Sequence, residues 1–177
     1  MSDLDLVERL RAAITEVPDF PREGVVFRDL TTLFSRGDVF KAAVDTLAAA
    51  HRDQGIDQIV GVESRGFVVG GALAYAMAIG FVPVRKKGKL PRETLSVSYA
   101  LEYGEGVLEI HADALHSGER VLVVDDLLAT GGTAAATVSL VEQLGGVVVG
   151  IDFLVELEAL GGAKQLGDRP HVSLIRF

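Results

Sequence analysis

Apolar residues alternate between short runs and helical stripes along most of the chain. The runs are rich in Val and Ile, which is typical of strands buried on both faces of a sheet, and they occupy residues 56–62, 81–84, 121–124 and 147–155. Helical stripes or small apolar stretches separate them at residues 38–51, 66–78 and 134–144. This alternation predicts an α/β fold, a parallel sheet flanked by helices, with a ligand outside the carboxyl ends of the strands.

Three segments depart from this alternation. Apolar side chains at helical spacing predict an N-terminal helix over residues 3–17, and prolines with a glycine predict a loop over residues 18–29. Residues 94–111 show a period of two that glycines interrupt, which predicts a two-stranded flap. At the C-terminus, a short helix near 163–166 and a strand at 171–177 are expected to form a small cap.

Composition narrows the class of protein. The chain has 177 residues, of which 49% are hydrophobic, and this is enough for one domain with a substantial core. Its formal net charge of −8 disfavours nucleic acid and anionic membranes as partners. No apolar run reaches the roughly 18 residues of a membrane span. The absence of cysteine suits a reducing, cytoplasmic location.

The segment after the strand at 121–124 carries the strongest chemical signal. Asp125 and Asp126 stand where this strand is expected to end, and two adjacent, partly desolvated acids repel each other unless a partner binds them. A turn of small residues then leads into the helix at 134–144, whose first N–H groups attract an anion. An ordinary helix cap is the simpler alternative, but it leaves the two acids unexplained. The pattern predicts ribose at the acids and phosphate in the turn, which comprises Ala129, Thr130, Gly131, Gly132 and Thr133.

A basic run provides a second candidate for anion binding. Residues 85–92 place five positive charges within eight residues of an otherwise acidic chain. A glycine and a proline in this run argue against a regular helix. A solvated basic loop is the alternative, but the phosphate motif elsewhere in the chain favours a role in binding pyrophosphate.

Residues 121–133 are similar to the 13-residue signature of the type I phosphoribosyltransferases. Further segments resemble the adenine phosphoribosyltransferases of that family and follow the family's order, at residues 20–29, 63–67, 85–91 and 98–104. The resemblance implies the family's fold over one domain, residues 1–177, with a hood from about 1–34 and the C-terminal segment, and a lid at about 85–106. It also implies a homodimer, and Mg²⁺ carried by the pyrophosphate group rather than held directly by side chains.

The resemblance implies a role for individual residues as well. Contacts to adenine are implied for Val26, Phe27, Arg28 and Leu157. Contacts to pyrophosphate are implied for Ser64, Arg65, Arg85 and Lys89, beside a cis peptide bond near Glu63–Ser64. Asp125 and Asp126 would bind the ribose hydroxyls, and the turn at 129–133 would bind the 5′-phosphate. Glu102 resembles the catalytic glutamate of the family, and Tyr103 next to it would belong to the lid.

The implied reaction is transfer of the phosphoribosyl group from 5-phosphoribosyl-1-pyrophosphate (PRPP) to adenine, which gives AMP and pyrophosphate. One alternative is a transferase for a 6-oxopurine, which would keep the phosphate turn and change only the hood. The other is a regulator that binds PRPP as a signal. A regulator of this kind would usually add a DNA-binding segment or a basic face, and this sequence shows neither.

Overall fold

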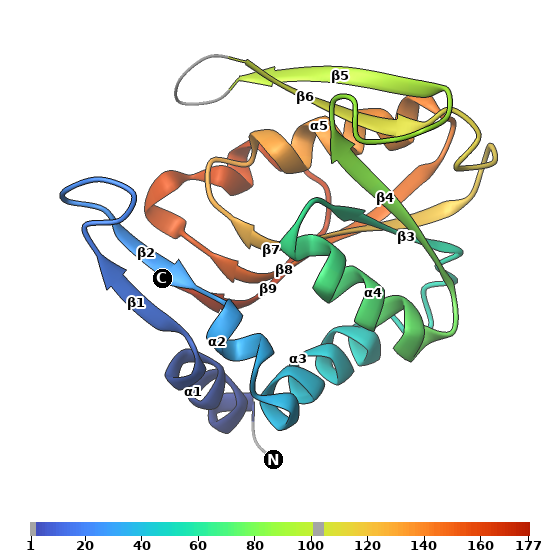
Figure 1. Cartoon of the computed structure of the whole chain (residues 1–177). Helices are drawn as coiled ribbons and strands as arrows, with labels where there is room; N and C mark the ends of the chain where they lie inside the picture. Colours follow the sequence, from blue (N-terminus) through green and yellow to red (C-terminus); the bar gives the residue numbers. More distant parts are fainter. Residues whose placement is uncertain (1–2, 101–104) are drawn as a thin grey trace.

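A mixed sheet of seven strands forms the centre of the molecule (Figure 1), and the computed structural model describes residues 3–100 and 105–177. Four strand pairs are parallel, whereas β6 pairs antiparallel with both β4 and β5. The predicted α/β class with a mainly parallel sheet is confirmed. From edge to edge the strands are β5 (Thr94–Ala100), β6 (Glu105–His111), β4 (Gly80–Lys86), β3 (Gln58–Val62), β7 (Arg120–Leu128), β8 (Val147–Glu156) and β9 (His171–Arg176).

Helices cover both faces of this sheet (Figure 1). In β7, Leu122 and Val124 belong to the core on the side of α3 and α4, whereas Val121 and Val123 belong to the core on the side of α5. Both faces of the strand are therefore buried, as its uninterrupted apolar run predicts. None of the helices in the described part of the chain is long and apolar enough to cross a membrane. The helices are α1 (Asp3–Ala13), α2 (Thr31–Phe34), α3 (Gly37–Ala50), α4 (Arg65–Met77) and α5 (Gly132–Gln143).

The close packing of α4 on the sheet depends on glycine. The ring of Phe81 fills the space that a Cβ would occupy at Gly61 of β3 and at Gly70 of α4. Glycine at these two positions lets the helix and the strand approach each other around one large aromatic side chain. The small, apolar helix predicted over residues 66–78 is confirmed, and its sequence reflects this contact.

The N-terminal prediction is wrong in part. The helix ends at Ala13, and a hairpin of β1 (Thr15–Pro18) and β2 (Val26–Asp29) replaces the helix end and the predicted loop. Thr15 and Val17 of β1 are β-branched and pair with residues of β2. Val17 also stands three residues after Ile14, so its position fits the helical stripe as well as a strand. The apolar stripe of α1 is buried within this chain.

The C-terminal prediction also needs correction. The strand β9 does not belong to a cap but pairs in parallel with β8 at the edge of the main sheet. Two short 3-10 helices, η1 (Glu158–Leu160) and η2 (Gly162–Leu166), connect β8 to it. The flap is confirmed for the described residues, because β5 and β6 pair antiparallel. Figure 1 shows these two strands lying over α5, on the opposite side of the sheet from α4.

Candidate active site

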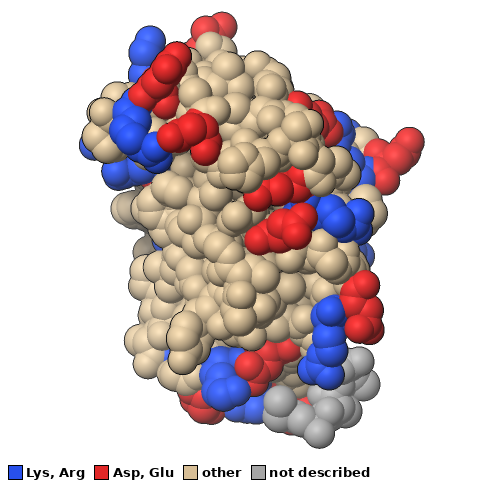
Figure 2. Space-filling view, turned by 90° about the vertical axis from the view of Figure 1, so that its right-hand side faces the viewer, with Lys and Arg blue, Asp and Glu red and all other residues tan. Residues whose placement is uncertain are grey.

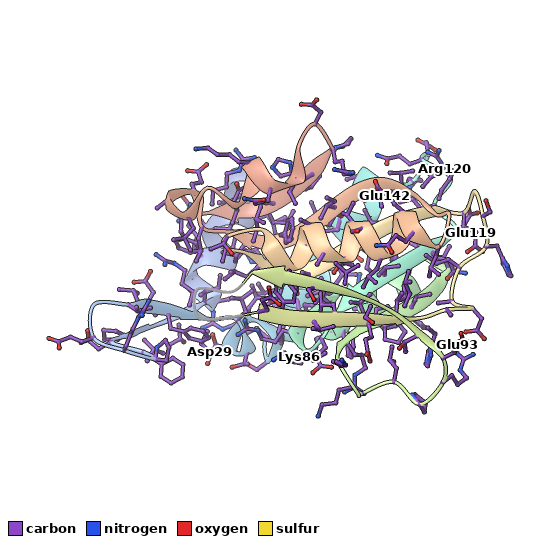
Figure 3. All side chains as sticks on the ribbon, turned by 90° about the horizontal axis from the view of Figure 1, so that it is seen from above. Asp29, Lys86, Glu93, Glu119, Arg120 and Glu142 are labelled. Atoms are coloured by element: carbon purple, nitrogen blue, oxygen red, sulfur yellow. The ribbon has the colours of Figure 1, made fainter. Side chains whose placement is uncertain are left out.

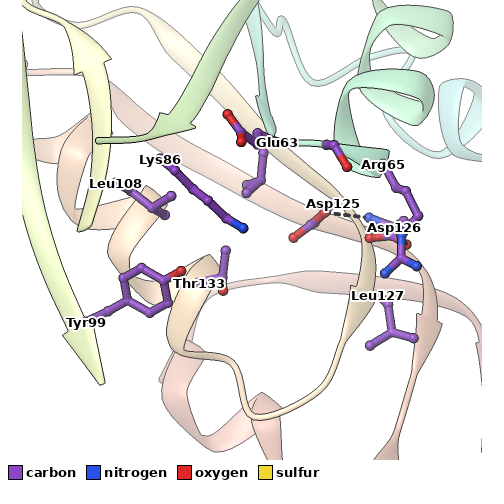
Figure 4. Close-up of a pocket in the computed structure, with 11 residues that line it drawn as sticks. Glu63, Arg65, Lys86, Tyr99, Leu108, Asp125, Asp126, Leu127 and Thr133 are labelled. Atoms are coloured by element: carbon purple, nitrogen blue, oxygen red, sulfur yellow. Dashed lines mark hydrogen bonds and ion pairs between the residues drawn. The ribbon is translucent and has the colours of Figure 1, made fainter. Parts of the chain in front are cut away.

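A cavity of about 420 Å³ opens at the carboxyl ends of β3, β4 and β7, next to the flap (Figure 4). This is where an open parallel sheet presents its ligand site. Seen from above, Lys86 lies beside the flap strands, on the side toward Asp29 of the N-terminal hairpin and away from Glu119 and Arg120 (Figure 3). The cavity is lined by Val62, Glu63, Ser64, Arg65, Lys86, Tyr99, Leu108, Asp125, Asp126, Leu127 and Thr133.

Asp125 and Asp126 form the acidic part of the wall. They lie within β7, which continues to Leu128 instead of ending at Val124 as predicted. The N–H of Asp126 donates a hydrogen bond to Asp125 Oδ1 at 2.9 Å. Burial raises the pKa of Asp125 well above its ordinary value, and the charge of Asp126 raises it further. Burial also raises the pKa of Asp126, against the opposing effect of Arg65. Carboxyl groups perturbed in this way are characteristic of binding sites.

Arg65 joins the acidic pair to the start of α4. Its Nε lies 2.6 Å from Asp126 Oδ2, and its guanidinium carbon lies 5.7 Å from the centre of the Phe27 ring. The next residue is Gly66, where a Cβ would lie only 2.8 Å from Asp125 Oδ1. The glycine therefore allows the first turn of α4 to approach both acids, and it brings the guanidinium into the cavity (Figure 4).

The turn at residues 129–133 connects β7 to α5. Gly131 precedes the helix with φ = +84°, in the left-handed region that favours glycine. A Cβ on Gly131 would collide with the carbonyl oxygen of Gly162, and one on Gly162 would collide with that of Ala129. The turn lines a small cavity of about 70 Å³ next to Asp125. At the N-terminus of a helix, a cavity of this kind can hold an anion against backbone N–H groups. The sequence prediction missed the contact with Gly162, although the pair Gly161–Gly162 was a visible signal.

The loop between β3 and α4 forms another wall of the cavity of about 420 Å³. The peptide bond between Glu63 and Ser64 is cis, as the resemblance implies. Both residues line the cavity next to Arg65. Glu63 also binds the basic segment, since its Oε2 accepts a hydrogen bond from Arg85 Nε at 2.9 Å.

The basic residues divide between the two faces of β4. Val82 and Val84 pack toward α5, and Lys86 continues this alternation, so its ammonium group points into the cavity (Figure 4). Arg85 lies on the other face. It donates to Glu63 and, from its Nη1, to the carbonyl oxygen of Lys89 at 3.0 Å. Of the expected pyrophosphate ligands, Ser64 and Arg65 line the cavity, whereas Arg85 and Lys89 do not. Lys86, which lines the cavity, was not among the residues expected to bind pyrophosphate.

Tyr99 and Leu108 are two further lining residues that the sequence prediction did not single out. Both belong to the flap, and the ring of Tyr99 occupies the space that a Cβ on Gly106 would fill. Its hydroxyl lies toward Thr133 in Figure 4. The period of two in the flap was the available signal, because Leu95, Val97 and Tyr99 share one face.

The expected adenine residues lie in the hairpin and after β8. Phe27 of β2 stacks edge-on against Phe20, with ring centres 5.1 Å apart, and Val26 is exposed. The guanidinium of Arg28 lies 4.1 Å from the centre of the Phe177 ring, which joins the hairpin to the C-terminus. Leu157 packs against the core and does not line the cavity. The structure thus brings Phe27 to Arg65 but gives no such contact for Leu157.

Two of the predicted residues, Glu102 and Tyr103, lie outside the described residues. Among the residues that are described, no cluster of three His, Cys, Asp or Glu side chains forms a metal site. The carboxylate oxygens of Asp125, Asp126 and Glu63 line the cavity, and oxygen is the ligand that Mg²⁺ prefers. The site can therefore accommodate Mg²⁺ bound mainly to the phosphate groups of a ligand.

Comparison with known proteins identifies the family. Residues 34–169 match the phosphoribosyl transferase domain family. An adenine phosphoribosyltransferase of Salinispora tropica is 53% identical over 174 residues, which cover 98% of this chain and 93% of the relative. The crystal structure of the adenine phosphoribosyltransferase from Thermoanaerobacter pseudethanolicus is 50% identical and superposes with a TM-score of 0.93 over 97% of this chain and 99% of that one.

A third relative was solved with bound ligands. The adenine phosphoribosyltransferase from Saccharomyces cerevisiae, complexed with adenine and an imino-altritol bisphosphate, is 41% identical. It superposes with a TM-score of 0.91 over 97% of this chain and 99% of that chain. The matched domain covers most of the chain, and the relatives match nearly all of it. The chain therefore belongs to the phosphoribosyltransferase family, in its adenine phosphoribosyltransferase branch.

Proposed function

We propose that the chain transfers the phosphoribosyl group of PRPP to adenine and releases AMP and pyrophosphate. The observation that carries this proposal is a cavity that combines the acidic pair with the cations Arg65 and Lys86, directly next to the small cavity of the turn at 129–133, with which it shares Asp125 and Thr133. In it, a phosphate would bind the N-terminus of α5 and the ribose hydroxyls would bind Asp125 and Asp126. The yeast relative's complex with adenine supports adenine as the base.

The cations would act where negative charge develops. Cleavage of the anomeric C–O bond leaves positive charge on the ribose and negative charge on the departing pyrophosphate. Arg65 and Lys86 are placed to neutralise the leaving group, with Ser64 as a further ligand, and such preorganised charge lowers the barrier. Mg²⁺, when bound with PRPP, would supply additional positive charge at the same oxygens. Arg85 and Lys89 would contribute through the shape of the basic turn.

The remaining predicted parts complete the proposal. The hood would comprise residues 1–34 and the C-terminal segment, where Phe27 stacks on adenine and Val26, Arg28 and Leu157 surround it. Glu102, with Tyr103 beside it, would act from the lid at 85–106, either on the purine proton or on the positive ribose. A closed lid would exclude the water that otherwise hydrolyses PRPP. A cytoplasmic location is part of the proposal, and cell fractionation tests it.

We also propose a homodimer, formed through the exposed face of α4. The stripe of α1 is buried within the chain, whereas Val68 and Tyr75 of α4 are exposed, Tyr75 by 90%. A broad uncharged area covers much of the side of the molecule where α4 leads into β4 (Figure 2). A two-fold interface places a patch against its own copy, so an uncharged patch avoids like-charge repulsion.

The test is a comparison of purines in one assay. Purified protein, Mg²⁺ and PRPP are incubated in turn with adenine, hypoxanthine, guanine and xanthine, and the nucleotide product is separated by chromatography. The proposal predicts AMP from adenine and little product from the 6-oxopurines. Comparable turnover of a 6-oxopurine would make the chain a transferase of different specificity. Binding of PRPP without turnover of any base would indicate a sensor.

A further inference from the structure

A buried carboxylate lies behind the basic turn at residues 86–89. Glu109 of β6 is only 6% exposed, and its Oε2 accepts a hydrogen bond from the N–H of Gly88 at 2.9 Å. The preceding residue, Leu108, lines the cavity, so Glu109 lies on the opposite face of the strand. The proposed reaction gives this carboxylate no direct contact with substrate.

The hydrogen bond to Gly88 completes the anchoring of the turn. The N–H of Lys89 donates to the carbonyl of Lys86 at 3.3 Å, and the N–H of Lys87 donates to the carbonyl of Val107 at 3.1 Å. Gly88 itself has φ = +77°, a conformation that favours glycine. The acceptor for the Gly88 N–H is the side chain of Glu109 rather than a backbone carbonyl of this turn. The direction of the turn therefore depends on a side chain from another strand.

The charges around the turn explain why the acceptor is a carboxylate. Arg85 lies opposite Glu109 across β4 and β6, where facing side chains of an antiparallel pair share one face. Three lysines within residues 86–89 repel one another, and a negative charge behind them offsets that repulsion. A buried carboxylate is costly unless it is hydrogen bonded and near positive charge, and Glu109 meets both conditions.

We propose that Glu109 is a positioning residue, which fixes the turn at 86–89 so that Lys86 enters the cavity where the pyrophosphate of PRPP would bind. This inference rests on the proposed function of that cavity. With this assignment, the two faces of β4 have different roles. Lys86 would contact the ligand, while Arg85, Glu63 and Glu109 hold the backbone that carries it.

Three substitutions of Glu109 separate hydrogen bonding from packing. Glu109→Asp keeps the charge but is one methylene too short to reach the Gly88 N–H. Glu109→Gln keeps the length and an acceptor oxygen, and Glu109→Ala removes both. We expect the KM for PRPP to rise about tenfold in the Asp and Ala variants, the scale of one lost charge-assisted hydrogen bond. The Gln variant keeps the hydrogen bond to Gly88 and loses only the offsetting charge, so its KM for PRPP should stay within about threefold of wild type, and the KM for adenine should not change in any of the variants.

The matched control is His111→Ala. His111 is also buried, lies two residues further along β6 on the same face, and pairs with Thr94 of β5. Its removal should lower the Tm without a selective change in the KM for PRPP. A purely structural role of Glu109 would make the Glu109 variants behave like this control.

Lys86→Ala distinguishes failure of this inference from failure of the proposed function. If Lys86→Ala leaves the KM for PRPP unchanged, the assignment of the cavity is wrong. If Lys86→Ala raises it but Glu109→Asp does not, or if Glu109→Gln fails to preserve PRPP binding, the positioning role is overturned. A selective rise in the KM for PRPP in the Asp variant, with rescue by Gln, supports it.

Discussion

Among single residues, Asp125 shows the clearest conflict between stability and binding. Its carboxyl is buried beside Asp126, and both the burial and the neighbouring charge raise its pKa. Because the folded pKa lies above the unfolded one, stability is greatest below the ordinary aspartate pKa of 3.8 and falls as the pH rises through the folded pKa. At neutral pH the protein therefore carries a cost at this position, which a bound ribose or cation would relieve.

Asp125→Asn tests this conflict directly. The isosteric amide removes the buried charge, so the Tm of the ligand-free protein at pH 8 should rise by about 2–4 °C, which is roughly 1 kcal/mol in a chain of this size. The difference between variant and wild type should shrink as the pH is lowered. PRPP affinity, measured by calorimetry at pH 8, should fall. A variant that is less stable than wild type and binds PRPP normally would contradict the assignment.

Glu102 is the residue on which the proposed chemistry depends most. Glu102→Gln should lower kcat by on the order of 10²-fold, the usual effect of losing one acid–base group, while PRPP and adenine still bind. Steady-state kinetics and calorimetry on the same preparation separate the two effects. Near-normal turnover in this variant would remove Glu102 from the mechanism.

Residue spacing could have identified Lys86 in advance. The strand was predicted to end at Val84, so the period of two was not extended to the basic run. The strand in fact continues to Lys86, which makes Val82, Val84 and Lys86 neighbours on one face. The position of Arg85 over Glu63 could not be inferred, because it depends on a contact between the end of β4 and the loop after β3.

At the scale of elements, a buried ion pair joins α3 to the sheet. His51, just after α3, contacts Asp152 of β8 with 2.7 Å between Nε2 and Oδ2, and both side chains are almost fully buried. The hydrogen bond to Asp152 raises the pKa of His51 above its ordinary value of 6.5. The stability from this histidine is therefore fully present below pH 6.5 and is lost as the pH rises through the folded pKa.

The variant His51→Leu should show this dependence. At pH 6 it leaves Asp152 buried without a partner, which costs about 3–5 kcal/mol in comparable sites. The Tm difference from wild type should shrink as the pH is raised through the folded pKa of His51, because wild type then loses the charge on this residue. His116→Leu, at an exposed histidine, is the control and should show little difference over the same pH range. An equal loss in His51→Leu throughout that range would exclude a charged His51.

The elements that sequence predicts well here are those with local signals. The strand of β7, the glycine turn and the helix α5 follow from a contiguous apolar run, two glycines and helical spacing. The edge strand β9 was recognised as a strand, but its pairing with β8 is a non-local choice that no local pattern encodes. The hairpin strand β1 was missed because its apolar spacing also continues the stripe of α1.

At the scale of the whole molecule, the fold brings distant segments to one end of the sheet. The cavity draws on residues from 62 to 133, and the hairpin beside it contacts the C-terminal Phe177 through Arg28. Parallel strands produce this convergence because their carboxyl ends share one edge. The family and the reaction could be predicted from sequence because several motifs occur in order, not because any one of them defines the cavity.

The proposed homodimer makes a prediction at the same scale. Tyr75→Glu would place a carboxylate from each copy in an uncharged interface, where like charges are costly. Light scattering coupled to gel filtration should give twice the chain mass of 18.8 kDa for wild type and a mass near 18.8 kDa for the variant. The control is Glu142→Ala, on the exposed surface of α5, which should remain dimeric. A tyrosine control at Tyr99 is unsuitable because this residue lines the cavity. A dimer that survives Tyr75→Glu would place the interface elsewhere.

The most direct test of the central claim is a crystal structure of the protein with AMP. The account predicts that the 5′-phosphate lies in the turn at 129–133, at the N-terminus of α5, with the ribose hydroxyls at Asp125 and Asp126 and the purine against Phe27. AMP bound at another place, with this turn empty while the nucleotide is well ordered, would contradict it.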